Sequence, residues 1–558
     1  MLLPETANDE TRALARQLGV TSTLADVLTQ KGIVDVAAAK KFLQPKLAHL
    51  TPPDAMADRD SAADRLVFAL RAGEPIVVFG DYDCDGITAA AIMTEALRKL
   101  GGRVTPLLAS RFDGGYGLSD DALQRVLSAS PKLLVTCDCG SSDHPRVHAA
   151  ARAGIDVIVI DHHLVPAEAL DAVAFLNPHR PECGFPYKGL ASCGLALSIA
   201  AAVRTKLGVE LDMRPFLDLV AVGTIADVAP LDGDNRALVR SGMELLRNGA
   251  RPGLKALAEY AKLNLSGGLT AEDISFGIAP RINAPGRMGA PEMALELLLA
   301  RDTMQARSAA AQCEQANQRR KEIQDRMITE ALADIAQRGL ADQNAIVVGR
   351  ENWHHGVVGI VAGRVASQFH KSVIVASIEQ GIAKGSVRSA RGVPVVTALN
   401  RCRSLLLRLG GHEKAAGVEF EASKLMALQE AFSAECASLM NDPAAVMPVE
   451  QRVHVRLDES DSAEGVFRDF ASLEPCGEAN RAPMLHVVDA RVIAVRDLKG
   501  HLRLELEVNG SPLAAFGPNL GKLASTIKGR VHVAGALRRD TYRGGGALEM
   551  RVDAVEGA

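Results

Sequence analysis

The segment PIVVFGDYDCDG (residues 75–86) joins a short apolar run to a cluster of three aspartates. Pro75 and Gly80 bound the run, which is typical of a buried β-strand. The pattern recurs where KLLVTC (132–137) leads into Asp138 and where DVIVI (156–160) leads into Asp161, His162 and His163. Helical stretches separate these runs, so the alternation predicts an α/β fold with a parallel sheet.

The carboxylates at the ends of these strands are expected to meet, because ligands of a parallel sheet bind outside the carboxyl ends of its strands. Asp227, in GTIADVAP after an apolar helical stretch, is a fourth candidate. A single aspartate at a strand end more often caps a helix or closes a turn. Four acidic clusters, one of them followed by two histidines, are much harder to explain in that way.

So many carboxylates in one place would repel one another and could not all stay ionised without cations. Two divalent metal ions are the economical answer, and oxygen ligands with one or two imidazoles suit Mn²⁺ or Mg²⁺. Two such ions about 3.5–4 Å apart activate water and neutralise a phosphoryl transition state. The sequence therefore predicts hydrolysis of a phosphate ester or anhydride.

The composition is that of a globular protein: 558 residues, 47% hydrophobic and 23% charged, which excludes a mostly disordered or fibrous chain. The net charge of −4 excludes a strongly basic nucleic-acid coat protein, so any polyanion must be held by a local basic groove or by metal ions. An acidic N-terminus and the lack of a long apolar run predict a soluble, cytoplasmic protein with no membrane partner. The nine scattered cysteines are expected to be reduced, and a structural zinc site at Cys137 and Cys139 is not expected.

At roughly 150 residues per domain the length predicts three or four domains. The segment from Leu295 to Gln337 has no Gly or Pro and should form one long helix or two abutting helices that bridge two domains. A second, smaller α/β region follows it, and about five period-two strands near the C-terminus predict a small antiparallel barrel. The expected division is a helical leader (1–50), a first α/β domain (51–294), the connecting helix (295–340), a second α/β domain (341–447) and the barrel (448–558).

These acidic clusters resemble the four motifs of the DHH phosphoesterase superfamily, and the whole chain is similar to the RecJ family of single-strand-specific exonucleases. The shared segments are GDYDCDG (80–86), SRFDGGYGLS (110–119), PRINAPGRMG (280–289), WHHGVVGIVAGR (353–364), GSVRS (385–389) and GGHEKAAG (410–417). The resemblance implies a DHH catalytic domain, a DHH-associated domain with a GGH motif, and a C-terminal OB-fold that binds nucleic acid. The segment EPCGEANRAP (474–483) departs from the family at Cys476, Ala479 and Arg481.

The resemblance also implies roles for individual residues. The metal ligands would be Asp83, Asp85, Asp138, His162 and Asp227, with Asp138 bridging two Mn²⁺ or Mg²⁺ ions and Asp81 as a further ligand. His163 would lie near the scissile phosphate, where an imidazole can donate a hydrogen bond, and Asp161 would orient an imidazole. The implied activity is stepwise 5′-to-3′ removal of nucleotides from single-stranded DNA, in repair and recombination.

Further residues fit a track for the DNA strand. Arg111 can clamp a phosphate and Tyr116 offers a ring for base stacking, although a mobile Gly-rich hairpin with a solvated arginine is the plain alternative. Arg281, Asn283 and Arg287 are expected on an irregular loop, which by itself indicates only a surface loop. His354 is interpreted as a substrate contact or local packing, with a second metal site less favoured because no carboxylates surround it. A phosphate-gripping surface would be completed by Ser386, Arg388, Ser389, Gly410, Gly411 and His412.

Two other function classes stay open at this point. The first is another DHH phosphohydrolase, acting on pyrophosphate, short oligonucleotides or cyclic dinucleotides, although the barrel favours long single strands. The second is a binding protein that has lost catalysis, although every expected metal ligand is present. The expected partners are single-stranded DNA, a helicase and a single-strand-binding protein, and the expected state is a monomer.

Overall fold

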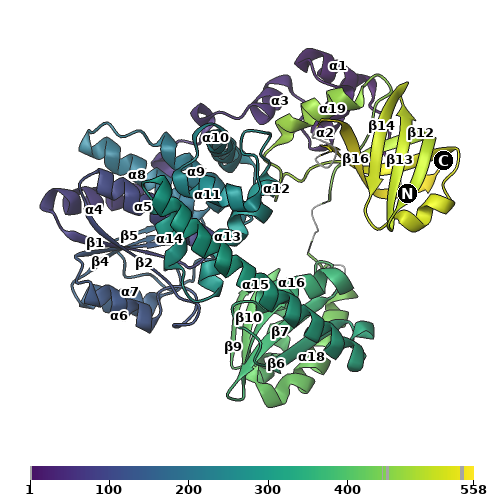
Figure 1. Cartoon of the computed structure of the whole chain (residues 1–558). Helices are drawn as coiled ribbons and strands as arrows, with labels where there is room; N and C mark the ends of the chain where they lie inside the picture. Colours follow the sequence, from purple (N-terminus) through teal and green to yellow (C-terminus); the bar gives the residue numbers. More distant parts are fainter. Residues whose placement is uncertain (1–2, 443, 448–450, 541–545) are drawn as a thin grey trace.

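The apolar runs of the first α/β region form a five-stranded parallel sheet in the order β2-β1-β3-β4-β5. The strands are β1 (Pro75–Gly80), β2 (Arg103–Leu108), β3 (Leu133–Cys137), β4 (Asp156–Ile160) and β5 (Ala174–Leu176). Helix α4 (Arg59–Ala72) precedes β1, and α8 (Ser192–Leu207) follows β5. Between the strands lie α5 (Cys84–Lys99), α6 (Asp120–Ser128) and α7 (His144–Arg152). The computed structural model describes residues 3–442, 444–447, 451–540 and 546–558, and Figure 1 shows this sheet with helices on both faces.

A helical layer completes the first domain. It contains α9 (Leu217–Ala226), α10 (Gly233–Gly249), α11 (Pro252–Ala261), α12 (Ala271–Asp273), a π-helical turn (Ile274–Ile278), α13 (Ala279–Arg287) and α14 (Glu292–Leu299). The expected irregular loop around residues 281–287 is wrong, because this segment is helix α13. Pro280 lies in its first turn, where a proline costs little because the N–H there has no helical partner anyway.

The long helix α15 (Thr303–Gln337) has 35 residues and is about 52 Å long at 1.5 Å per residue. Asp302 caps its first turn by accepting hydrogen bonds from the N–H groups of Met304 and Gln305, so of the two predicted arrangements the structure has two abutting helices, α14 and α15. Its first half packs into the core of the first domain through Ala306 and Ala310. Its second half packs against the next domain through Met327 and Ala331, as Figure 1 shows.

The second α/β domain has a mixed sheet in the order β6-β7-β8-β10-β9, in which β6 and β7 are parallel and the other pairs antiparallel. Its strands are β6 (Ala345–Glu351), β7 (Ser372–Glu379), β8 (Ile382–Arg388), β9 (Arg408–His412) and β10 (Ala415–Glu421). Its helices are α16 (Val358–Phe369), α17 (Val395–Arg401) and α18 (Leu425–Met440).

The C-terminal strands close into a barrel, because β12 pairs with both β13 and β15. The strands are β11 (His454–Arg456), β12 (Met484–Leu498), β13 (His501–Val508), β14 (Ser511–Gly517), β15 (Arg530–Arg539) and β16 (Leu548–Gly557), and helix α19 (Ala463–Phe470) precedes β12. The pairing is antiparallel as expected except that β14 and β16 are parallel, as are β11 and β12. The predicted first residue of this domain, 448, lies outside the described residues.

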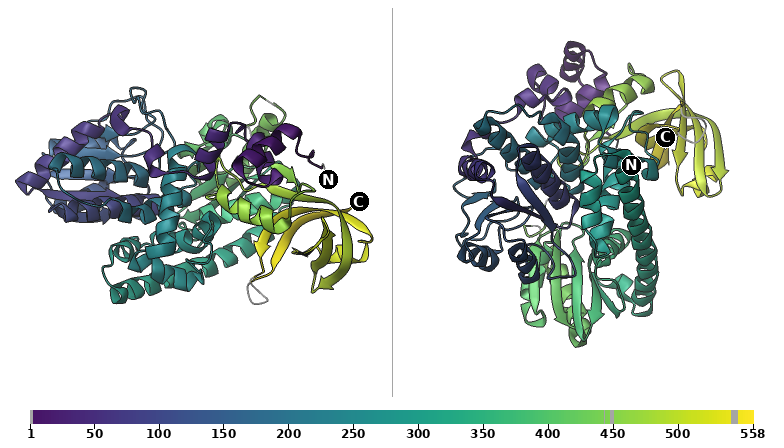
Figure 2. Two further views of the ribbon diagram at one scale, coloured as in Figure 1. Left: turned by 90° about the horizontal axis from the view of Figure 1, so that it is seen from above. Right: turned by 60° about the vertical axis from the view of Figure 1, so that its left-hand side comes forward.

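The leader helices α1 (Asp9–Leu18), α2 (Ser22–Gln30) and α3 (Val36–Leu43) lie beside the barrel and α19, far from them in sequence (Figures 1 and 2). Leu24, Val27 and Leu28 are fully buried and share one core with barrel residues such as Leu485 and Val533. The sequence pattern did not predict this contact, because an apolar helix face does not identify what covers it.

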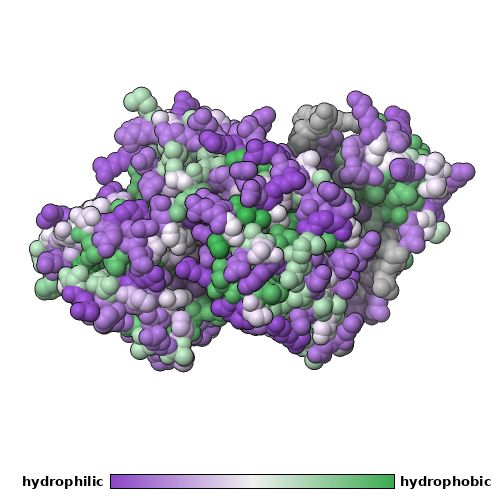
Figure 3. Space-filling model, turned by 90° about the horizontal axis from the view of Figure 1, so that it is seen from below, coloured by the Kyte–Doolittle hydropathy of each residue, from purple (hydrophilic) through white to green (hydrophobic). Residues whose placement is uncertain are grey.

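All nine cysteines are free, and eight of them are buried. Within the described ranges, each helix is too short or too polar to cross a membrane. The face in Figure 3 intersperses hydrophilic and hydrophobic side chains.

Candidate metal centre

Three aspartates stand side by side at the carboxyl edge of the parallel sheet. Asp81, Asp138 and Asp161 are the first residues after β1, β3 and β4. Each donates its backbone N–H to the neighbouring strand: Asp81 to Cys137 at 3.1 Å, Asp138 to Ile160 at 2.8 Å and Asp161 to Leu176 at 3.0 Å. The ladder thus extends one residue beyond each strand and fixes the three carboxylates in a row.

The turn after β1 brings two further carboxylates to this edge. Asp83 caps α5 by accepting a hydrogen bond from the N–H of Gly86 at 3.1 Å. A Cβ atom on Gly86 would lie 2.7 Å from the backbone of Asp81, so the turn can fold back this tightly only with glycine here. Asp85, in the first turn of α5, is 1% exposed.

The N-terminus of α8 binds the centre from the opposite side. The backbone N–H groups of Ser192 and Cys193 donate to the two carboxylate oxygens of Asp85 at 2.7 and 3.0 Å. The Ser192 hydroxyl donates to Oδ1 of Asp138 at 3.0 Å. Sequence analysis missed Ser192; a serine before an apolar helix indicates a helix start, but not which distant carboxylate it binds.

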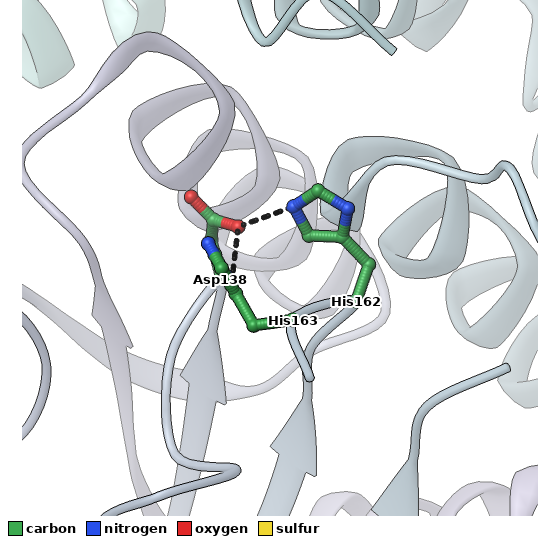
Figure 4. Close-up of side chains that lie close together, drawn as sticks. All are labelled: Asp138, His162 and His163. Atoms are coloured by element: carbon green, nitrogen blue, oxygen red, sulfur yellow. Dashed lines mark ion pairs between the residues drawn. The ribbon is translucent and has the colours of Figure 1, made fainter. Parts of the chain in front are cut away.

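The carboxylates and imidazoles form three overlapping groups whose candidate ligand atoms lie within 4.8 Å of one another. The groups are Asp85 with His162 and Asp227, Asp81 with Asp83 and Asp138, and Asp138 with His162 and His163. Asp138 thus belongs to two of the three groups, and Figure 4 shows both imidazoles beside its carboxylate. The structure therefore brings together every residue that sequence analysis expected at the metal centre.

The ring nitrogen Nε2 of His162 points into the carboxylates. It lies 3.2 Å from Oδ1 of Asp138, 3.7 Å from Oδ2 of Asp227 and 3.9 Å from Oδ2 of Asp85, yet this buried nitrogen has no hydrogen-bond partner among the described residues. Burial lowers the pKa of His162, opposed by the charge of Asp85. A neutral imidazole with a free nitrogen among carboxylates is the form that binds a metal ion.

Burial is also the largest cause that raises the pKa values of Asp81, Asp138 and Asp227, and the neighbouring carboxylates raise them further. These acids therefore resist ionisation together unless positive charge enters the centre. The donor set of carboxylate oxygens and neutral imidazole fits Mn²⁺ or Mg²⁺.

His163 faces Asp161 instead of the middle of the cluster. Its Nδ1 lies 2.7 Å from Oδ1 of Asp161. Burial alone would lower the pKa of His163, but the hydrogen bond and charge of Asp161 raise it to about 9. Burial would raise the pKa of Asp161, and the hydrogen bond from His163 lowers it instead, so the pair is ionic at neutral pH.

Tyr116 packs against His163 as well. Its hydroxyl lies 2.9 Å from Nδ1 of His163 and donates to the backbone oxygen of Asp138 at 3.2 Å, and the two rings meet edge to face with centroids 5.2 Å apart. The ring is 43% exposed. Tyr116 thus belongs to the wall of the metal centre.

A cationic wall adjoins the carboxylates. The Arg111 guanidinium stacks 4.2 Å from the ring centre of Tyr82, and Arg287 donates to the backbone oxygen of Gly356 at 3.2 Å. Burial, then Arg111, Arg320 and other charges, lower the pKa of Arg287 to about 10. Burial and Arg111 also lower the pKa of Arg388, so these arginines are close enough to repel one another and together favour an anion.

The second domain supplies the rest of this wall. Arg388 donates to the hydroxyl of Ser386 at 2.9 Å, and His354 meets the ring of Phe112 edge to face. Burial lowers the pKa of His412, and the charges that add to this effect include Arg388 and His163. His412 is therefore near enough to Arg388 and His163 for their charges to act on it, and Gly410 and Gly411 precede it on β9.

Some expected DNA contacts are already engaged within the protein. Arg281 is 8% exposed and lies 2.6 Å from Glu314 of α15, and Asn283 is half-buried in α13. The hydroxyl of Ser389 donates to the backbone oxygen of Val393 at 2.6 Å.

The segment 474–483, which departs from the family pattern, lies against α10. Arg236 of α10 donates to the backbone oxygens of Ser472, Leu473 and Pro475 at 3.0, 3.0 and 3.2 Å. The same guanidinium donates to Phe42 of the leader at 2.8 Å. This segment therefore joins the barrel to the catalytic domain.

Comparisons with known proteins agree with this geometry. The DHH family N-terminal domain model matches residues 75–224, the DHHA1 domain model residues 342–438 and the RecJ OB domain model residues 453–554. The single-stranded-DNA-specific exonuclease RecJ of Escherichia coli (strain K12) is 34% identical over 543 residues, which cover 92% of each chain. The protein of that name in Thermus thermophilus is 35% identical over 520 residues, 92% of this chain and 72% of that one. The crystal structure of RecJ from Thermus thermophilus in complex with Mn²⁺ matches 100% of this chain and 79% of that chain, with a TM-score of 0.83 and 31% identity.

The parallel sheet and its carboxylate–histidine edge define a DHH-family protein. Within this class, the RecJ OB domain model and the sequence identity to RecJ proteins over nearly the whole chain identify one family. The chain belongs to the RecJ family.

Proposed function

We propose that this protein is a metal-dependent exonuclease that removes nucleotides from the 5′ end of single-stranded DNA, in repair and recombination. The observation that carries the proposal is the proximity of two oppositely charged sets of side chains: a buried carboxylate–imidazole centre and arginines from two domains, of which Arg111 is near enough to lower the pKa of Asp81. Hydrolysis of a phosphodiester needs both: the carboxylate–imidazole centre to bind metal ions and the arginines to hold the phosphate charge.

In this proposal Asp85, His162 and Asp227 would hold one divalent ion, Asp81 and Asp83 would hold a second, and Asp138 would be a ligand of both. Bound Mn²⁺ or Mg²⁺ would lower the pKa of water and neutralise the phosphoryl charge. The grouping of ligand atoms and the free Nε2 of His162 support this assignment. The choice of metal ion agrees with the Thermus thermophilus RecJ structures, which are complexes with Mn²⁺ and Mg²⁺.

His163 would hold a proton beside the scissile phosphate. Asp161 keeps its Nδ1 protonated, so the imidazolium can donate its Nε2 proton to a phosphate oxygen or to the leaving oxygen. Arg111, Arg287, Arg388 and His412 would bind phosphates of the strand, with His354, Ser386, Gly410 and Gly411 in the same wall. Asn283 would be a weaker contact to the strand. Arg281 and Ser389 would position neighbouring residues instead of binding DNA, because the polar groups of these two side chains already bind other parts of the protein.

We further infer that the domains divide at residues 1–50, 51–294, 295–340, 341–447 and 448–558, a division that the family-model ranges support. The free cysteines support a reducing, cytoplasmic location. Delivery of single strands by a helicase and a single-strand-binding protein, and a monomeric state, complete the proposal.

The test is digestion in Mn²⁺ of single-stranded DNA labelled at either end, beside duplex DNA, RNA and a dinucleotide. Mononucleotides released only from the 5′ end of single-stranded DNA are the expected result. Intact long DNA with hydrolysis of the dinucleotide or of pyrophosphate would overturn the DNA track and leave a small-substrate phosphohydrolase.

A further inference from the structure

A cavity of about 490 Å³ lies at the opposite end of the catalytic domain from the metal centre. It is lined by Arg98 and Lys99 at the end of α5 and by Asp218 at the start of α9. The other ends of these two helices carry Asp85 and Asp227, and a helix of 16 residues such as α5 spans about 24 Å. The volume lies in the range of roughly 300–1,000 Å³ that small-molecule sites occupy.

The charges around this cavity do not cancel. Two carboxylates line it, and two cations neutralise them: Arg251 lies 3.0 Å from Asp218 and 3.1 Å from Glu95, and Lys99 lies 2.7 Å from Glu95. Two further cations, Arg98 and Arg301, line the same cavity. Over the described ranges, no ion pair joins either of them to a carboxylate.

These two arginines also influence each other. Arg98 donates to the backbone oxygen of Val104 at 2.9 Å, which fixes its guanidinium at the cavity. Partial burial lowers the pKa of Arg98, and the charge of Arg301 lowers it further. Two neighbouring like charges without a counter-ion favour a bound anion, and phosphate is one of the two groups, with carboxylate, whose geometry the guanidinium fork matches.

The remaining wall is apolar. Leu245, Leu298, Pro215 and Pro252 line it, and Lys99 stacks 5.1 Å from the ring centre of the buried Phe216. Such a wall suits a flat ring next to the charged group.

We propose that this cavity binds a phosphate monoester that carries an aromatic ring, the chemistry of a nucleoside monophosphate. The cavity site does not depend on the proposed nuclease activity. That activity would release nucleoside monophosphates, and only the identification of the cavity's ligand with this reaction product rests on the proposed function. A ligand held by Arg98 of α5 and Arg301, just before α15, would tie α5 to the start of the connecting helix.

Occupancy of the cavity should tighten metal binding. Helices α5 and α9 touch closely, since a Cβ on Gly223 of α9 would lie 2.3 Å from the Thr88 hydroxyl of α5. A ligand that orders the far ends of these helices lowers the ordering cost of assembling Asp85 and Asp227 around an ion. We expect Mn²⁺ affinity to rise about fivefold or more, in the usual range of such couplings.

The first experiment is calorimetric titration of the full chain with dAMP or inorganic phosphate in EDTA. Binding of dAMP at two sites is expected, one in the cavity and one at Arg111 and Arg388 beside the metal centre, which we call the cleft. The Arg111→Ala/Arg388→Ala variant should keep only the cavity site, and Arg98→Gln/Arg301→Gln should weaken that site at least tenfold. The matched control Lys132→Gln/Arg152→Gln, which removes two charges elsewhere on the same domain, should bind as the wild type does.

Unchanged dAMP binding in the Arg98→Gln/Arg301→Gln variant would overturn the site. Complete loss of dAMP binding in the cleft variant would do so as well. Inorganic phosphate should bind the cavity at least tenfold more weakly than dAMP, and equal affinity would overturn the assignment of an aromatic ring.

The second experiment measures free Mn²⁺ by electron paramagnetic resonance in the cleft variant, with and without dAMP. Tighter Mn²⁺ binding with dAMP, absent when Arg98→Gln/Arg301→Gln is added, is expected. Equal Mn²⁺ affinity with and without dAMP would overturn the coupling. Both readouts are binding measurements, so they stand or fall separately from the nuclease assignment.

Discussion

Asp138 combines the features that single out a functional residue. It follows β3 in the left-handed conformation with φ of 65°, which costs a non-glycine residue of the order of 1–3 kcal/mol. It is also 1% exposed and belongs to two of the three candidate ligand groups. Its backbone hydrogen bond to Ile160 and the hydrogen bond from the Ser192 hydroxyl hold Asp138 in this conformation. These contacts offset the conformational strain at Asp138.

Substituting Asp138→Asn should leave the metal-free protein folded and at least as stable as the wild type. The change removes a carboxyl group whose ionised form is disfavoured by burial and by its neighbours, while the amide oxygen can still accept the Ser192 hydrogen bond. It should also remove most of the stabilisation by Mn²⁺, which for an ion at 100 times its dissociation constant is about 2.7 kcal/mol. Thermal melts with EDTA and with Mn²⁺ measure both effects.

Asp121→Asn, on the exposed start of α6, is the control and should keep the full Mn²⁺ shift. An equal Mn²⁺ shift in Asp138→Asn and wild type would remove Asp138 from the ligand set.

The Asp161–His163 pair predicts a pH dependence of stability. The pKa of His163 is raised to about 9 in the folded state, against about 6.5 in the unfolded chain. The stabilisation is therefore complete below pH 6.5 and is lost as the pH rises through 9. Urea unfolding in EDTA should show the wild type losing stability over this range relative to His163→Gln, and parallel curves would contradict the ionic pair.

At the residue scale the sequence predicted well which carboxylates and imidazoles lie together, and it predicted their surroundings poorly. The ligands follow strands of one parallel sheet, so their meeting follows from topology alone. Ser192 and Arg236 could not be assigned in this way, because their partners lie 54 or more residues away and the local sequence carries no sign of them. The same holds for Arg281, whose ion pair with Glu314 depends on how α13 packs against α15.

At the scale of elements, the strands and α15 were predictable because their apolar runs and lack of Gly and Pro are local signals. Helix α13 was not, because Pro280 and Pro285 read as breakers although both fit a short helix within its tertiary contacts. The docking of leader, barrel and α10 was also hidden, since it depends on apolar contacts between distant segments and on hydrogen bonds from Arg236 and Arg240 to backbone oxygens.

Substituting Arg236→Met should release this docking. The guanidinium is 3% exposed, stacks 4.0 Å from the Phe42 ring centre and serves backbone oxygens of two distant segments. Asn480 also donates to Leu473 and Pro475, so the change leaves two backbone oxygens, those of Phe42 and Ser472, without a donor. Each costs about 1–3 kcal/mol, so the unfolding free energy should fall by at least about 2 kcal/mol. Urea unfolding measures the loss, and limited proteolysis should show faster cleavage between the second domain and the barrel.

Arg236→Lys keeps the charge but has fewer donors, so its unfolding free energy should lie between those of the wild type and Arg236→Met. A change of less than about 0.5 kcal/mol in Arg236→Met would show that the joint is held by other contacts.

For the whole molecule, the shared core of leader and barrel decides how the chain can be divided. Removing the barrel alone would expose Leu24, Val27 and Leu28, each worth about 1.5–3 kcal/mol when buried, and the product should aggregate. Removing residues 1–45 together with 448–558 takes both halves of that core away. The remaining cores of the two α/β domains and of α15 draw on residues from 47 onward and stay complete.

This shortened chain should hydrolyse short oligonucleotides within a few-fold of the full chain, because the metal centre and the arginine wall lie within it. Its binding to long single strands should weaken at least tenfold, and the salt dependence of that binding should fall by about one unit of log–log slope for each phosphate that the barrel no longer neutralises. Binding titrations at several salt concentrations, beside initial rates on a short substrate, measure the two effects. If the barrel only stabilises the catalytic domain, its removal should reduce short-substrate hydrolysis and long-strand binding equally. If the barrel holds the strand, its removal should reduce long-strand binding alone.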